Sequence, residues 1–137
     1  MLPMKHCLRF ALTACLSVTS TLSVAQTYPT RAIEWVVPYA AGGGTDIVAR
    51  DVTQKMSVTT KWTFVIDNKP GPGGNLGIDT AAKAPADGYS LVIGQTSNLA
   101  INPSLYSKLP YDPIKDLTPI GLIGNAPLVL VVPTDSP

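Results

Sequence analysis

Glycine clusters that directly follow short β-branched runs constrain the fold of this chain more than any other feature. Residues 33–38 form such a run, and it leads into the loop Ala40 to Asp46, which contains three consecutive glycines. A short, bulky apolar run is typical of a buried parallel strand. Thr45 precedes a segment with helical apolar spacing and is a good N-cap. The pattern therefore predicts a strand, a glycine loop and a helix, in that order.

The same succession recurs along the chain. We expect helices over 46–57 and 75–84, the second of them capped by Asn75, and strands over 62–67 and 89–94. Prolines keep the stretch 102–118 mostly irregular. Two further strand candidates follow at 120–123 and 128–132. Alternation of strands with helices indicates the α/β class with a parallel sheet.

The first 25 residues form a segment of their own. A basic start is followed by an apolar stretch rich in small residues, which ends in Ser-Val-Ala at 23–25. This order is typical of a secretory signal peptide cleaved after Ala25. The stretch is shorter than the roughly 20 strongly apolar residues that a membrane-spanning helix needs. We expect a periplasmic protein, with a lipid anchor at Cys15, which lies in a lipobox-like sequence, as the minor alternative.

Cleavage after Ala25 would remove both cysteines and the single histidine. The remaining chain, 26–137, then has no disulfide and none of the usual zinc, thiol or imidazole chemistry. Its charges are nearly balanced and form no run of like sign, so nucleic acid is not an expected partner. Most acidic residues lie singly, as solvated charges do. We therefore expect no catalytic residue and no metal site, and a small α/β enzyme is a remote alternative.

Nucleotide-binding motifs that also use glycine loops are absent. A phosphate loop needs a lysine between the last glycine and the hydroxyl residue, but Gly44 is followed directly by Thr45. Gly71, Gly73 and Gly77 are spaced one residue too far apart for the dinucleotide fingerprint. No cofactor is expected.

Three loops are candidates for ligand binding, because ligands of open α/β sheets lie beyond the carboxyl ends of the strands. The first, 40–46, offers consecutive backbone N–H groups at a helix start, which suits a carboxylate or phosphate, although its glycines could equally form a plain tight turn. The second, 70–75, repeats this device. The third, 96–98, brings hydroxyl and amide groups that in isolation are more often turn or cap residues. Asp46 is interpreted chiefly as a first-turn acid that complements the helix dipole.

Four segments, in fixed order and spacing, carry a family resemblance: YPTRAIEWVVPYAAGGGTDIVAR, DNKPGPGGNLGIDTAAKAPADGYSLVIG, AINPSLYSKLPYDPIKDLTPIGLI and PLVLVVP. Together they resemble the Bug family of extracytoplasmic receptors, which are similar to the substrate-binding components of tripartite tricarboxylate transporters. The resemblance implies a two-domain, Venus-flytrap receptor of periplasmic-binding-protein type that closes on small carboxylic acids. It also implies a membrane permease of the tripartite tricarboxylate type as a partner, and no enzymatic activity.

Carried over to this sequence, the resemblance places ligand-binding residues in the three loops. Backbone amides and ordered water near the first loop typically hold the carboxylate in that family. The residues implied are Tyr39, Ala41, Gly42, Gly43, Gly44, Thr45, Asp46, Gly73, Gly74, Asn75, Thr96, Ser97 and Asn98, with Asn102 nearby.

Three positions depart from the family pattern. Ala41 stands where a proline is common, Gly44 where a small hydroxyl residue is common, and Leu99 where a histidine is frequent. Backbone binding tolerates such changes, whereas side-chain specificity is put in doubt. The resemblance therefore implies a carboxylate without naming which one.

Length is the largest departure. Family members are usually about twice as long, as two lobes flanking a cleft require. The resemblance therefore assigns 26–137 to the amino-terminal part of the first lobe only. A half-cleft buries less of a ligand's surface, so weak or absent binding is predicted. A truncated, non-binding remnant of such a receptor is the alternative reading.

Overall fold

The computed structural model describes residues 27–127 and 129–134. The signal peptide and the lipid anchor expected within 1–25 lie outside these described residues. Every helix and strand below belongs to a unit that begins at Arg31. Within the described residues, no helix combines the length and the apolar character needed to cross a bilayer.

Three parallel strands form the sheet, in the order β2-β1-β3. They are β1 (Ile33–Val37), β2 (Phe64–Asn68) and β3 (Ser90–Val92). The central strand pairs in parallel with both neighbours. Because all three strands run in the same direction, the loops that follow them emerge at one edge of the sheet.

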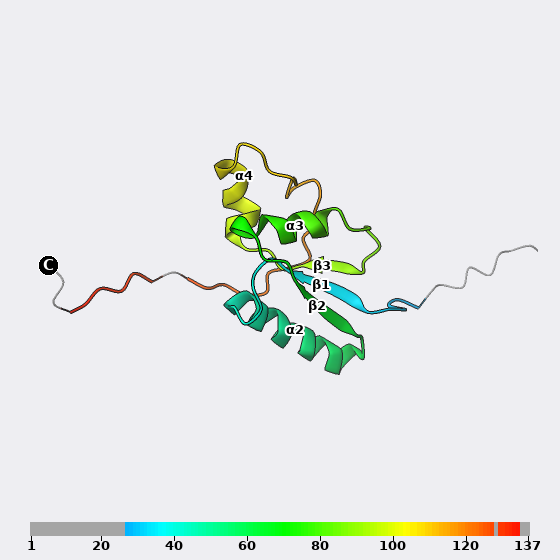
Figure 1. Cartoon of the computed structure of the whole chain (residues 1–137). Helices are drawn as coiled ribbons and strands as arrows, with labels where there is room; N and C mark the ends of the chain where they lie inside the picture. The colour runs from blue at the N-terminus through cyan, green and yellow to red at the C-terminus, as the bar shows by residue number, and fades with distance from the viewer. Residues whose placement is uncertain (1–26, 128, 135–137) are drawn as a thin grey trace, which may run out of the picture. The chain divides into compact units, whose positions relative to one another are not determined.

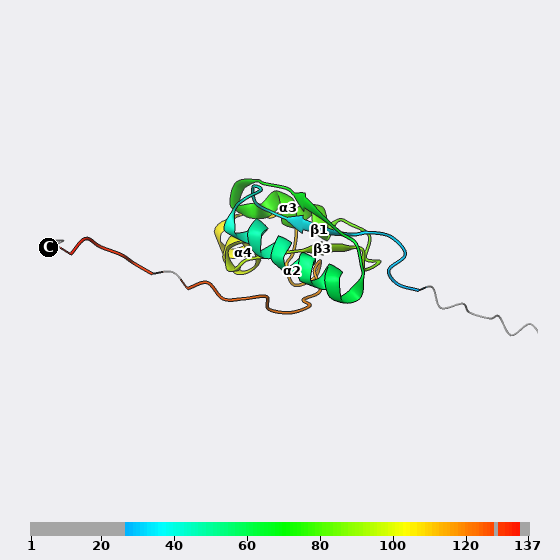
Figure 2. The same ribbon diagram turned by 90° about the horizontal axis from the view of Figure 1, so that it is seen from below.

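Helices cover both faces of this sheet. The long helix α2 (Gly44–Thr60) lies on one face and α3 (Asn75–Ala82) on the other, as Figure 1 shows. Figure 2 views the same arrangement with α2 in front of the strands. A single 3₁₀ turn, η1 (Pro72–Gly74), precedes α3. After β3 comes a π-helical turn, η2 (Ser97–Ile101), that continues into the short helix α4 (Asn102–Leu105).

The central strand is buried on both faces except at Glu34, as its bulky, largely apolar run predicts. Trp35 and Val37 pack with Ala49 of α2, and the Trp35 ring meets Phe64 edge-on at a centroid distance of 6.2 Å. Val36 points to the opposite face, because side chains alternate along a strand, and it is also buried. This double burial fixes β1 in the middle and so brings its following loop between the other two.

The predicted helix starts need correction. Thr45 is not the N-cap of α2; the helix begins at Gly44, and Gly43 is its N-cap. Thr45 already lies inside the helix, and its hydroxyl accepts a hydrogen bond from the side chain of Gln95. Likewise Asn75 does not cap α3. It has helical backbone angles, and Gly74 precedes it as the N-cap.

Two strand candidates were also wrong. Residues 120–123 and the described residues of 128–132 form no strand. A strand requires a hydrogen-bonded neighbour, and side chains here such as Leu122 and Leu130 are about nine-tenths exposed (89% and 91%). β3 is also shorter than the predicted span 89–94. An apolar run alone does not make a strand, because a pairing partner is also needed.

Candidate functional site

The three predicted loops meet at the carboxyl edge of the sheet. Tyr39, just after β1, places its hydroxyl oxygen 3.2 Å from the hydroxyl oxygen of Ser97. The same Tyr39 oxygen accepts a 3.1 Å hydrogen bond from the side-chain amide of Asn98. The second loop reaches this point at Gly74. We call Tyr39, Gly74, Ser97 and Asn98 the loop cluster.

Gly74 can occupy its place only because it has no side chain. Its φ is +76°, a left-handed conformation that residues with a Cβ rarely adopt. A Cβ at this position would lie 2.8 Å from Asn98 Nδ2 and 3.2 Å from the Tyr39 hydroxyl oxygen. The sequence signal of a glycine pair before a helix therefore marks a close approach between loops as well as a turn.

Asn98 lies at the centre of the loop cluster and is fully buried. Its side-chain oxygen accepts the backbone N–H of Gln95 at 2.8 Å, while its side-chain nitrogen donates to Tyr39. Both ends of the amide are thus paired, as a buried polar group requires. This single side chain fixes the third loop on the first.

A second bridge links the third loop to the first turn of α2. The side-chain amide of Gln95 donates a hydrogen bond to the hydroxyl of Thr45. Gln95 is exposed and was not among the expected site residues, although it directly precedes the predicted third loop. The side chain of Thr45 therefore joins α2 to the residue before the third loop, in place of the capping role predicted for it.

The first turn of α2 presents unshielded backbone to solvent. Gly42, Gly43 and Gly44 are all exposed. The N–H groups of Gly44 and Thr45 lie in the first turn, where no helical carbonyl precedes them to accept a hydrogen bond. The positive end of the helix dipole lies at the same place. This geometry suits an anion such as a carboxylate.

Asp46 is buried, and its carboxylate is occupied within the protein. One carboxylate oxygen accepts the N–H of Gly42 and the Nε of Arg50, both at 2.8 Å. The other accepts the side-chain amide of Asn68 at 2.9 Å. The hydrogen bond from Arg50, then those from Gly42 and Asn68, hold the pKa of Asp46 well below its usual range, against the opposing effect of burial. The carboxylate therefore fixes the shape of the glycine loop, and hydrogen bonds within the chain engage both of its oxygens.

Asn68 ties β2 to this loop as well. The nitrogen that donates to Asp46 also donates to the backbone oxygen of Tyr39 at 3.1 Å. Sequence reasoning treated this part of the chain as the end of a strand. A polar residue at the carboxyl end of a parallel strand was the available signal, since that edge is where ligand-binding loops gather.

Asp46→Asn is expected to lower the thermal unfolding midpoint at neutral pH. An asparagine at this position has no charge to pair with Arg50. Its amide nitrogen also cannot accept a hydrogen bond, whereas both carboxylate oxygens of Asp46 do. Because the folded pKa of Asp46 is depressed, its stabilisation is fully present above the unfolded aspartate value of about 3.9 and is lost as pH falls toward the folded value. The midpoints of wild type and variant should therefore converge as the pH is lowered below about 4.

Asp51→Asn is the matched control, since it removes the same charge from an exposed position of the same helix. Calorimetric or fluorescence unfolding of the three proteins across pH tests the account. A gap between wild type and Asp46→Asn that stays constant down to strongly acidic pH would contradict it.

Side-chain hydrogen bonds from Asn102 and Tyr111 support the second loop. Asn102 donates to the backbone oxygen of Gly73 at 3.0 Å and to the side-chain oxygen of Asn75 at 2.6 Å. The Tyr111 hydroxyl donates to the same Asn75 oxygen at 2.9 Å. The side chain of Asn75 therefore serves this network instead of capping α3.

The structure brings some of the expected site residues into contact and leaves others apart. The structure brings together Tyr39, Gly74, Ser97 and Asn98, and it joins Thr45 to them through Gln95. Ala41 and Thr96 are exposed, and the Thr96 side chain makes no capping hydrogen bond to the turn that follows. Within the described residues, no group of three His, Cys, Asp or Glu side chains is placed to hold a metal ion.

Comparison with protein families gives a match over most of these elements. The model described as "Tripartite tricarboxylate transporter family receptor" matches residues 48–137. Among curated proteins, Protein BugT of Bordetella pertussis is 41% identical over 108 residues, which is 78% of this chain and 33% of BugT. The chain thus spans about a third of the length of such relatives.

Solved structures give the same result. MatC from Rhodopseudomonas palustris with bound malate superimposes with a TM-score of 0.67 at 40% identity, over 70% of this chain and 33% of MatC. The periplasmic binding protein BugD superimposes with a TM-score of 0.61 at 42% identity, over 65% of this chain and 29% of BugD. The small parallel sheet with its helices is therefore part of a periplasmic-binding-protein fold, as the resemblance implied.

Proposed function

Because the chain belongs to the tripartite tricarboxylate transporter receptor family, we propose that it binds a small carboxylate in the periplasm, at the loop cluster and the first turn of α2. The observation that carries this proposal is the meeting of three separate loops at Tyr39, beside exposed glycine backbone at a helix start. The ligand is held and released without chemical change, and a membrane permease of the same transporter type receives it.

The hydrogen-bond donors that could hold a carboxylate at this site are all uncharged. Tyr39 accepts a hydrogen bond from Asn98, so its own hydrogen is left to donate to Ser97 or to a ligand oxygen. The backbone N–H groups of Gly44 and Thr45 add two donors at the positive end of the α2 dipole. Arg50, the nearest cation on α2, is already engaged with Asp46. A carboxylate is therefore bound by amides, hydroxyls and the dipole, without a salt bridge.

Malate is the natural first probe, since the solved structure of MatC contains it. The glycine loop is exposed, so a bound acid keeps part of its surface in water, and sites that capture small molecules tightly usually enclose most of the ligand. We expect millimolar affinity for the chain of 137 residues.

Isothermal calorimetry of the chain with malate tests the proposal. The matched control is malamide, which has the same skeleton with neutral amides in place of the two carboxylates. Saturable heat with malate and none with malamide is the expected result. No saturable heat with malate, or equal heat with malamide, would contradict carboxylate binding and would favour the alternative of a non-binding chain.

A further inference from the structure

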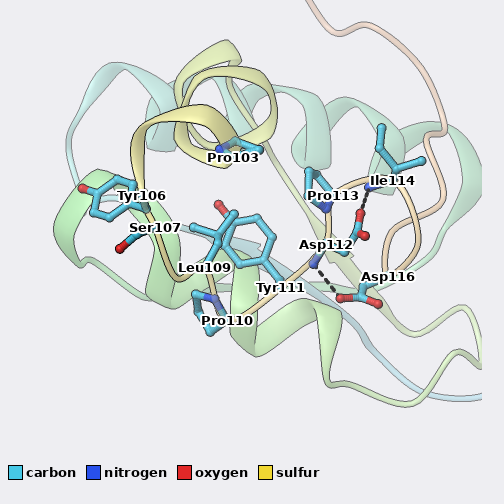
Figure 3. A pocket seen from close by; sticks show the side chains of 10 residues that line it. All are labelled: Pro103, Tyr106, Ser107, Leu109, Pro110, Tyr111, Asp112, Pro113, Ile114 and Asp116. Atoms are coloured by element: carbon cyan, nitrogen blue, oxygen red, sulfur yellow. Dashed lines mark hydrogen bonds between the residues drawn. The ribbon is translucent and has the colours of Figure 1, made fainter.

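Tyr111 reaches the site from a part of the chain outside the three loops. It follows α4 in a proline-rich stretch and is only 5% exposed. Figure 3 shows it among the side chains that line a pocket with Pro103 and Tyr106. Its hydroxyl donates to the backbone oxygen of Asn98 at 2.7 Å and to the side-chain oxygen of Asn75 at 2.9 Å. These partners lie 13 and 36 positions away in the sequence.

The hydroxyl completes a hydrogen bond that the backbone cannot make. In the π-helical turn η2, the N–H of Asn102 donates to the oxygen of Ser97, five residues earlier. The next bond in this series would run from residue 103 to the oxygen of Asn98. Residue 103 is proline, which has no N–H. The Tyr111 hydroxyl supplies the missing donor to this buried oxygen.

The same hydroxyl therefore controls the orientation of Asn98. The Asn98 peptide carries the side chain that pairs with Tyr39 and with the N–H of Gln95. A tyrosine has one hydroxyl hydrogen, so the bonds to Asn98 and Asn75 share it. One atom thus connects the third loop to the second. Burial raises the pKa of Tyr111 above its usual value, which favours the protonated hydroxyl.

We propose that Tyr111 is a positioning residue for the carboxylate site: its hydroxyl holds the Asn98 peptide of the π-helical turn where Pro103 cannot, and so sets the side chain of Asn98 against Tyr39. This inference rests on the proposed function, because it assigns a residue that prepares the same site. Tyr111 does not touch the ligand.

The test is Tyr111→Phe, which removes only the oxygen. Loss of one such hydrogen bond is expected to weaken malate binding by about three- to tenfold in calorimetry. In the amide spectrum of the free protein, the resonances of the Asn98 side chain and of the Gln95 N–H should shift. Tyr89→Phe, the same change at the amino end of β3, should leave both readouts as in the wild type.

A second control separates positioning from stability. Val52→Ala shortens a half-buried side chain of α2 that packs against the core cluster containing Trp35 and Val37. It should lower the unfolding midpoint without changing malate affinity. Unchanged malate affinity in Tyr111→Phe, or equal weakening in Val52→Ala, would overturn the inference. If the wild type itself fails to bind malate, the proposed function fails, and the free-protein spectrum of Tyr111→Phe still tests the positioning of Asn98.

Discussion

Gly74→Ala is expected to destabilise the chain strongly. The residue has a φ of +76°, and the new methyl group would lie 2.8 Å from Asn98 Nδ2. Left-handed backbone costs a residue with a Cβ about 1–2 kcal/mol, and overpacking adds about 1–3 kcal/mol. Asn98 cannot move aside cheaply, because it is fully buried and both ends of its amide are hydrogen-bonded. The expected loss in unfolding free energy is therefore about 2–5 kcal/mol.

Gly44→Ala is the matched control. A Cβ at Gly44 meets nothing within 4 Å, and its φ is not positive. As the first residue of α2, it should accept alanine with a change within about 0.5 kcal/mol. Denaturant unfolding of wild type and both variants makes the comparison. Equal stability of the two variants would show that the second loop does not pack against Tyr39 and Asn98 as described.

Asn98→Asp is expected to keep the fold and to abolish malate binding. The new carboxylate has the same shape, accepts the Gln95 N–H as before, and can accept the Tyr39 hydroxyl hydrogen on its other oxygen. It also places a negative charge beside the proposed ligand. At a separation of about 6 Å and an effective dielectric constant of about 20, the repulsion is about 3 kcal/mol. This corresponds to more than about a hundredfold loss of affinity.

Asn125→Asp makes the same chemical change at an exposed position outside the loops. It should bind malate as the wild type does. Circular dichroism checks that Asn98→Asp remains folded, and calorimetry measures the binding. Malate affinity that is equal in the two variants would place the carboxylate away from Asn98.

Much of the fold could be predicted from the sequence because its signals are local. The β-branched run at 33–38 produced β1, and the glycine and proline clusters marked where each strand ends. The rule that ligand-binding loops gather at the carboxyl edge of a parallel sheet then predicted that three segments distant in the sequence lie close together. Gly74, Ser97 and Asn98 lie in loops named on that basis, whereas Tyr39 was implied only by the family resemblance.

The rest depends on contacts between distant residues, which leave no local pattern. Asn68 meets Asp46 from 22 positions away, and Tyr111 meets Asn75 from 36. The interpretation of Asp46 as a first-turn acid was correct in position, but its partners on other elements determine what it does. The predicted caps at Thr45 and Asn75 were wrong because both side chains are used in contacts with other parts of the chain.

The most direct test of the central claim is a chemical-shift titration of the ¹⁵N-labelled chain with malate. We expect shifts to concentrate on the backbone amides of Gly42 to Thr45 and on the side-chain amides of Asn98 and Gln95, with none of comparable size on the exposed face of α2. Malamide should leave these resonances in place. Malate shifts that are absent from the loops, or that spread evenly over the surface, would contradict a carboxylate site where the three loops meet.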